Sequence, residues 1–171
     1  MDSRATQIAR QVEKLKVLVV DDEPSMRKVV RALLQAIGIK TIHEAADGND
    51  GLDKIRMRAP DLVILDWEMP GPNGPEFMRA VRSPETFPLP DVPIIMLTGY
   101  SERSRVIEAM QLGVNEYLLK PVSSTALLTR IVSILVHPRP MVRRGDYYGP
   151  EPRPSLTPAK FAADPREILL V

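Results

Sequence analysis

The chain has 171 residues, a formal net charge of +1 and no cysteine. This length suits one domain with a remainder, the near-neutral charge argues against bulk electrostatic binding of nucleic acid or an anionic membrane, and the missing cysteine excludes disulfides and thiolate chemistry. No apolar run approaches the roughly 20 residues that cross a bilayer, and the polar segment 1–15 predicts no secretory signal. We therefore expect a cytoplasmic protein.

The first half of the chain alternates between strand-like and helix-like patterns. Residues 16–20 form a short apolar run that ends in Asp21-Asp22, as in a strand buried on both faces. Pro24 then opens a helix that Gly38 stops. A weaker strand follows at 40–45 and a helix at 47–59. This order predicts a parallel βαβ unit.

The alternation continues after residue 60. Strands are predicted at 61–66, 92–97 and 116–119, and helices at 76–82, 102–112 and 123–136. Prolines and glycines predict loops at 69–75 and 83–93. The five strands and five helices predict an α/β fold, a doubly wound parallel sheet with helices on both faces.

Proline divides the chain. Seven of the 17 prolines fall in the last 34 residues, a density that prevents a continuous helix or a central strand. We predict an N-terminal extension at 1–15, the folded domain at 16–137 and an extended, partly polyproline-like tail at 138–171. Within the tail, residues 139–153 are equally compatible with a disordered extension or with a docking segment, and the apolar end 168–171 is a candidate anchor.

Polar side chains follow the predicted strands. In parallel sheets the working site lies beyond the carboxyl ends of the strands, and those ends carry Asp21-Asp22, Asp66, Thr98 and Lys120. A carboxylate-rich pocket without sulfur or imidazole suits a hard divalent cation, most naturally Mg²⁺. A carboxylate nucleophile can form an acyl phosphate, while Lys120 and Thr98 would contact the phosphoryl oxygens.

These residues lie in four motifs with a known order. VLVVDDEPSMR, LVILDWEMPGPNG, IIMLTGY and YLLKP resemble the receiver domain of two-component response regulators over about residues 16–137. The resemblance implies a flavodoxin-like sheet of strand order 2-1-3-4-5. It also implies a protein that works as a phosphorylation switch, related in architecture to single-domain chemotaxis regulators, rather than as an enzyme.

The resemblance implies a role for each site residue. Asp66 would accept the phosphoryl group from a phosphohistidine on a histidine kinase or phosphotransferase. Asp22, Asp66 and the backbone carbonyl of Glu68 would ligate Mg²⁺, and Asp21 would act largely through water. Thr98 would bond the phosphoryl group and Lys120 would pair with it. Tyr117 matches the switch aromatic that turns inward as Thr98 moves, and the bond between Lys120 and Pro121 matches one that is cis in the family.

Four further positions near the site carry expectations of their own. Gly99 replaces the commoner alanine and would widen access to the phosphoryl group. Glu68 and Tyr100 follow Asp66 and Thr98 by two residues, and we hypothesise that this bulky pair slows the entry of water. Trp67 is predicted to be an exposed or half-buried loop aromatic.

Together, the motifs and the short tail predict a stand-alone receiver without a DNA-binding output domain. Its unknown output protein would bind the face formed by 102–112, 116–119 and 123–136, where the exposed candidates are Arg103, Arg105, Glu108 and Gln111. Phosphorylation would shift a two-state equilibrium, with a phosphorylation-dependent dimer as an open alternative.

Two other functions remain open at this point. A phosphate sink or relay uses the same chemistry without an output partner. A haloacid-dehalogenase-like phosphatase also uses an aspartate nucleophile with Mg²⁺, and Glu68 occupies the place of its general acid; however, Asp21-Asp22 precedes the nucleophile strand and a cap insertion is missing.

Overall fold

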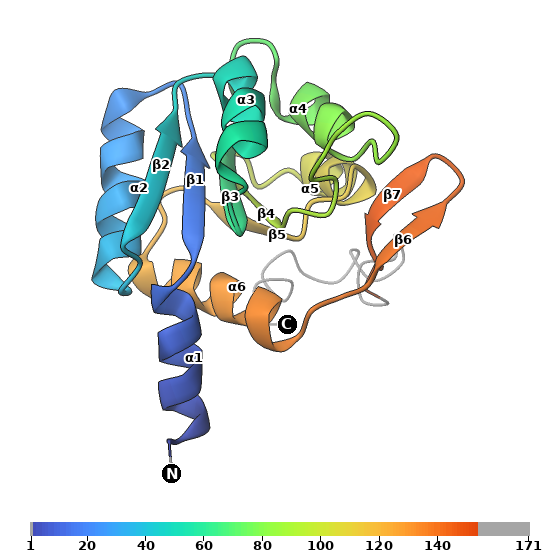
Figure 1. Ribbon diagram of the computed structural model, residues 1–171. Helices are drawn as coiled ribbons and strands as arrows, with labels where there is room; N and C mark the ends of the chain where they lie inside the picture. The colour runs from blue at the N-terminus through green and yellow to red at the C-terminus, as the bar shows by residue number, and fades with distance from the viewer. Residues whose placement is uncertain (1, 154–171) are drawn as a thin grey trace.

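The computed structural model describes residues 2–153 and has a central five-stranded parallel sheet of order β2-β1-β3-β4-β5 (Figure 1). This arrangement confirms the predicted fold class. The strands of the sheet are β1 (Lys16–Val20), β2 (Thr41–Ala45), β3 (Leu62–Asp66), β4 (Ile94–Thr98) and β5 (Glu116–Leu119). The helices are α1 (Arg4–Glu13), α2 (Pro24–Ala36), α3 (Gly48–Arg58), α4 (Gly74–Val81), α5 (Arg103–Gln111) and α6 (Ser124–Val136).

Both faces of the sheet are covered, which explains why its central strands are apolar without interruption. Alternate residues of β1 enter two separate cores: Leu18 and Val20 pack with residues of α3, α4 and α5, whereas Val17 and Val19 pack with residues of α2 and α6. All five residues of β3 and of β4 are buried. The burial on two faces fixes the register of these strands, and with it the place where each one ends.

Helix α1 precedes the sheet and was not predicted, because residues 1–15 were assigned only as an extension. Ser3 caps the helix by accepting a hydrogen bond from the Thr6 N–H at 3.2 Å. Val12 is buried in the same core as Leu34 of α2 and Ile131 of α6. Ile8 of the same helix packs against this core as well, so two apolar residues attach α1 to the domain.

The segment predicted as an extended tail contains an antiparallel hairpin, β6 (Met141–Arg144) and β7 (Tyr147–Pro150). Gly145 at the turn has a φ of +59°, a conformation that glycine adopts without strain. Pro140 precedes β6, and Pro150 is the last residue of β7, so the inner pairs of the ladder are free of proline. Proline therefore limits the length of these strands but does not prevent them.

Arg82, just after α4, connects the loops at the amino edge of the sheet. Its buried guanidinium donates to the carbonyl oxygens of Gly113 (3.0 Å), Pro90 (2.6 Å) and Val92 (2.8 Å) and to Asn115 Oδ1 (2.9 Å). Burial is the main reason that its pKa falls to about 10. Four acceptors from the two loops before β4 and β5 thus share one cation.

Residues 154–171 lie outside the described part, and with them the candidate anchor 168–171 and the last part of the predicted tail. Among the residues that the structure describes, no helix has the length and apolar character needed to span a membrane.

Candidate functional site

The carboxyl edge of the sheet brings the predicted polar residues together. Asp21 and Asp22 follow β1, and Asp66 ends β3; these three side chains offer carboxylate oxygens that all lie within 4.8 Å of one another. Thr98 ends β4, and Lys120 follows β5, with its Nζ 2.9 Å from Asp66 Oδ1. The parallel topology thus brings residues that are far apart in sequence together in one acidic site that also contains one amine.

Asp21 carries the clearest sign that this site is incomplete without a cation. Its Oδ1 accepts the Glu23 N–H at 2.9 Å, but its Oδ2 is the one buried side-chain oxygen or nitrogen within residues 2–153 that has no hydrogen-bond partner. Burial, followed by the charge of Asp66, raises the pKa of Asp21 to about 6. An orphaned carboxylate oxygen beside two further carboxylates fits a hard divalent cation such as Mg²⁺.

Asp66 is 3% exposed and is held from two sides. Lys120 Nζ donates to its Oδ1, and the Glu68 backbone N–H approaches the same oxygen at 3.4 Å. Burial alone would lower the pKa of Lys120, but the hydrogen bond and the charge of Asp66 raise it above its usual value. The amine is therefore a fixed positive charge beside an otherwise acidic group.

Thr98 is engaged by Glu68. The Thr98 hydroxyl donates to Glu68 Oε1, the Gly99 N–H approaches Glu68 Oε2 at 3.4 Å, and the Tyr100 N–H donates to Thr98 Oγ1 at 3.1 Å. A hydroxyl has one proton to donate. While Glu68 holds that proton, Thr98 has none to give to another acceptor.

The two tyrosines near the site differ in exposure. Tyr117 in β5 is 5% exposed and lies in the core with Val106 and Ala109 of α5, and burial is the main reason that its pKa is raised. Tyr100 is 47% exposed, and its ring lies 4.2 Å from the Arg105 guanidinium carbon. The bond between Lys120 and Pro121 is cis, as the sequence resemblance implied.

The prediction for Trp67 was wrong, because its side chain is only 4% exposed. A Cβ placed on Gly74 would lie 2.3 Å from Trp67 Cε3, so only glycine lets the start of α4 cover the indole ring. The glycine in the loop after Asp66 was the available signal, but it was interpreted only as a loop residue. The indole is therefore a buried reporter one residue from Asp66.

The family model for the response regulator receiver domain matches residues 17–132. The chain belongs to this family. The chemotaxis protein CheY of Pseudomonas aeruginosa is 38% identical over 120 residues, which are 70% of this chain and 95% of that protein.

Solved structures agree with the match. A putative response regulator from Chloroflexus aurantiacus has a TM-score of 0.66 at 31% identity and is matched over 72% of this chain and 98% of its own. Vibrio cholerae CheY4 has a TM-score of 0.61 at 35% identity, over 68% and 95% of the two chains. The protein is thus a phosphorylation-regulated response regulator of two-component signalling, and its acidic group is consistent with the Mg²⁺ site of receivers.

The receiver match ends before the hairpin. The hairpin lies against the loops before β4 and β5, at the amino-terminal ends of the strands and opposite the acidic site. The sequence motifs give no role to Glu116, Arg139 or Arg153, although these residues join the hairpin segment, residues 139–153, to β5 and to the loop before it. Nothing in the sequence pattern pairs them: Glu116 and Arg153 are 37 residues apart and belong to no repeat or motif.

Proposed function

We propose that this chain works as a receiver that accepts a phosphoryl group on Asp66 and signals by protein contact. The main support is the convergence of Asp21, Asp22 and Asp66 within 4.8 Å, with Lys120 bonded to Asp66. A phosphohistidine of a histidine kinase or phosphotransferase is the proposed donor. A carboxylate oxygen of Asp66 forms the new bond to phosphorus while the bond from phosphorus to the imidazole nitrogen breaks, and its electron pair stays on the imidazole.

The acidic residues have distinct parts in this proposal. Asp22, Asp66 and the backbone carbonyl of Glu68 would hold Mg²⁺, and Asp21 would be linked to it through water. The bound Mg²⁺ supplies positive charge that offsets repulsion between the carboxylates and an incoming phosphoryl group. Lys120 contributes the second positive charge from the β5 side.

Thr98 must exchange its partner when Asp66 is phosphorylated. Its hydroxyl proton now bonds to Glu68, so the proposed bond from Thr98 to a phosphoryl oxygen requires the Glu68 side chain to leave. Tyr117 would follow this change as the switch residue. The partner surface is the face of α5, β5 and α6, which are the helix 102–112, strand 116–119 and helix 123–136 of the sequence analysis.

The acceptor is tested by intact mass after incubation with a small phosphodonor and Mg²⁺. We expect one added phosphoryl group on the wild type and none on Asp66→Asn, which keeps the size of the side chain. Asp53→Asn, an exposed carboxylate on α3, is the matched control and should be phosphorylated like the wild type. A wild type that gains no phosphoryl group, or an Asp66→Asn variant that gains one, would contradict the proposal.

A sink or relay shares every feature of this site, so partner capture separates it from a switch. The phosphorylated chain should retain an output protein that Asp66→Asn does not, whereas a sink would show rapid back-transfer and no retained protein. Membership of the receiver family favours both over an aspartate-nucleophile phosphatase. Sustained turnover of a chromogenic phosphate ester would reverse that preference.

A further inference from the structure

The hairpin packs backbone to backbone against the loop between α5 and β5. A Cβ on Gly149 would lie 2.7 Å from the Cα of Gly113, and a Cβ on Gly113 would lie 2.8 Å from the Tyr148 carbonyl oxygen. Neither glycine can therefore accept a side chain without moving β7 away from the loop. The close approach of Gly149 to Gly113 forms only when the hairpin is docked on this loop.

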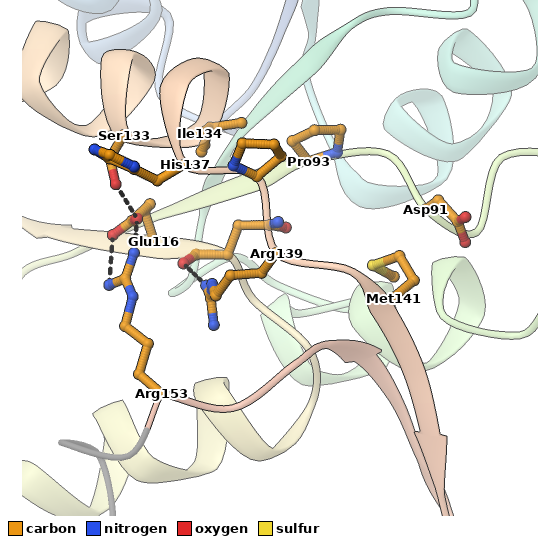
Figure 2. A pocket seen from close by; sticks show the side chains of 11 residues that line it. Asp91, Pro93, Glu116, Ser133, Ile134, His137, Arg139, Met141 and Arg153 are labelled. Atoms are coloured by element: carbon orange, nitrogen blue, oxygen red, sulfur yellow. Dashed lines mark hydrogen bonds and ion pairs between the residues drawn. The ribbon is translucent and has the colours of Figure 1, made fainter.

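Polar side chains attach the hairpin segment to both loops at this edge of the sheet. Tyr148 Oη donates to Asp91 Oδ1 at 2.5 Å, and Arg143 pairs with Glu85 at 2.5 Å, both in the loop before β4. Arg139 donates to the Asn115 carbonyl oxygen at 2.6 Å, in the loop before β5 (Figure 2). The segment therefore contacts the starts of two neighbouring strands.

Arg153 completes the pairing of a buried carboxylate in the receiver. Glu116, the first residue of β5, is 2% exposed; its Oε1 accepts hydrogen bonds from Arg153 and from Ser133 of α6. Figure 2 shows Arg153 reaching Glu116 from the end of the hairpin segment. Arg130 of α6 lies 3.6 Å from Oε2. A buried carboxylate needs such partners, and Arg153 supplies one of them from the end of the hairpin segment, beyond the receiver fold.

Strand β5 connects this interface to the acidic site. Its four residues begin at Glu116, paired with Arg153, and end just before Lys120, paired with Asp66. The Lys120 N–H also donates to the Thr98 carbonyl oxygen at 2.8 Å. One short strand thus carries an ion pair at each end, which places the hairpin interface and the acidic site at the two ends of the same element.

The interface is closely packed at Gly113 and Gly149 but incompletely filled beside Glu116. A cavity of about 110 Å³ lies between it and the receiver, lined by Glu116, Ser133, His137, Arg139, Met141 and Arg153 among others (Figure 2). An interface that is held largely by polar bonds and contains a cavity loses less on opening than a close-packed apolar core does. We therefore expect the hairpin segment to exchange between a docked and an undocked state.

We propose that residues 139–153 are a built-in regulatory element whose docking is thermodynamically linked to phosphorylation of Asp66 through β5. This inference rests on the proposed function. The docked arrangement is the one in which Lys120 reaches Asp66, so docking favours phosphoryl binding, and phosphoryl binding in turn favours docking. Arg153 is a positioning residue that acts through Glu116 and β5.

The test uses the full chain with Mg²⁺ and beryllium trifluoride, a non-covalent phosphoryl analogue, and follows Trp67 fluorescence. Arg153→Ala is expected to weaken apparent affinity for the analogue about fivefold or more, and Arg153→Lys to recover part of it. Arg144→Ala is the matched control, because it removes an equal charge whose partner Glu151 lies within the segment; its affinity should stay within about twofold of wild type. Tyr148→Phe, which keeps the ring and loses the bond to Asp91, should weaken affinity in the same direction.

Hydrogen exchange of residues 141–150 gives the reciprocal measurement. The analogue should slow exchange of the hairpin amides in the wild type and do so less in Arg153→Ala. Analogue binding with unchanged hairpin exchange, and equal affinities for wild type, Arg153→Ala and Tyr148→Phe, would overturn the linkage and leave the proposed function intact. A wild type that does not respond to the analogue would instead contradict the proposed function.

Discussion

The carboxylates at the two edges of the sheet differ in how many hydrogen-bond and ion-pair partners they have. At the carboxyl edge, Asp21, Asp22 and Asp66 crowd together with one amine, and Asp21 Oδ2 has no hydrogen-bond partner. At the amino edge, Glu116 is equally buried, but two arginines and a hydroxyl surround it. A carboxylate with all its partners stabilises the fold, whereas a cluster that lacks them is prepared for a ligand.

Removing the charge at the amino edge should have the largest effect on stability. Glu116→Gln leaves Arg130 and Arg153 without their buried counter-charge and should cost about 3 kcal/mol of the free energy of unfolding, measured by urea denaturation. Glu151→Gln, which disrupts an exposed pair with Arg144, is the control and should cost about 0–1 kcal/mol. Equal losses in the two variants would show that burial does not distinguish these pairs.

The same kind of change at the carboxyl edge should act with the opposite sign. Without divalent cations near pH 7.5, Asp21→Asn relieves a buried negative charge and should raise the free energy of unfolding by about 1–2 kcal/mol. The exposed control Asp53→Asn should change it by less than about 0.5 kcal/mol. A destabilised Asp21→Asn variant would remove the contrast between the edges.

Releasing Thr98 should have a kinetic effect of intermediate size. Glu68→Ala frees the Thr98 proton and removes a negative charge from the site, so uptake from a small phosphodonor should become about tenfold faster or more, as expected for one charged hydrogen bond. Glu102→Ala removes an exposed carboxylate near the same strand end and should leave the rate unchanged.

The same phosphorylated samples test the hypothesis that Glu68 and Tyr100 restrict water. If the bulky pair slows the entry of water, Glu68→Ala should lose its phosphoryl group faster than the wild type, as followed by intact mass over time. An unchanged decay rate would count against this role and leave the uptake prediction standing.

The smallest expected effect concerns pH and Mg²⁺. Burial raises the pKa of Asp21 in the folded chain from 3.8 to about 6. Between these values the folded state binds more protons, so without a cation this group makes the free energy of unfolding fall as pH rises. Mg²⁺ should offset that loss and raise Tm by a few degrees near pH 7.5, with less effect near pH 5. Thermal unfolding with and without Mg²⁺ measures the difference, and an equal shift at both pH values would disagree with it.

Sequence patterns predicted the fold and the acidic edge because both follow from local signals. The apolar runs 16–20 and 61–66 define buried parallel strands, and parallel strands place Asp22 and Asp66 at one edge without any knowledge of distant contacts. The proposed roles of these residues remain predictions that the experiments above address.

The features that the sequence did not predict depend on contacts between distant segments. The four-residue strands β6 and β7 have no clear periodic pattern, and their stability comes from packing against Gly113 and from the pairing of Arg153 with Glu116. Trp67 is buried because Gly74 lies over its ring, a contact visible only in three dimensions. Short strands and single glycines are specified by their surroundings more than by their own propensities.

The Arg82 guanidinium restricts how the loops at the amino edge can change in length. It binds Pro90 and Val92 on one side and Gly113 and Asn115 on the other, and lysine, with three donors at a single point, cannot reproduce this fork. Phe87 in the loop 83–93 packs in the core, so insertions should be tolerated at the exposed residues Glu85 and Thr86. Deletions that withdraw the carbonyl oxygens of Pro90 and Val92 would leave the buried Arg82 guanidinium with only two of its four acceptors. An insertion at this place would lie beside Arg143 of the hairpin, which pairs with Glu85.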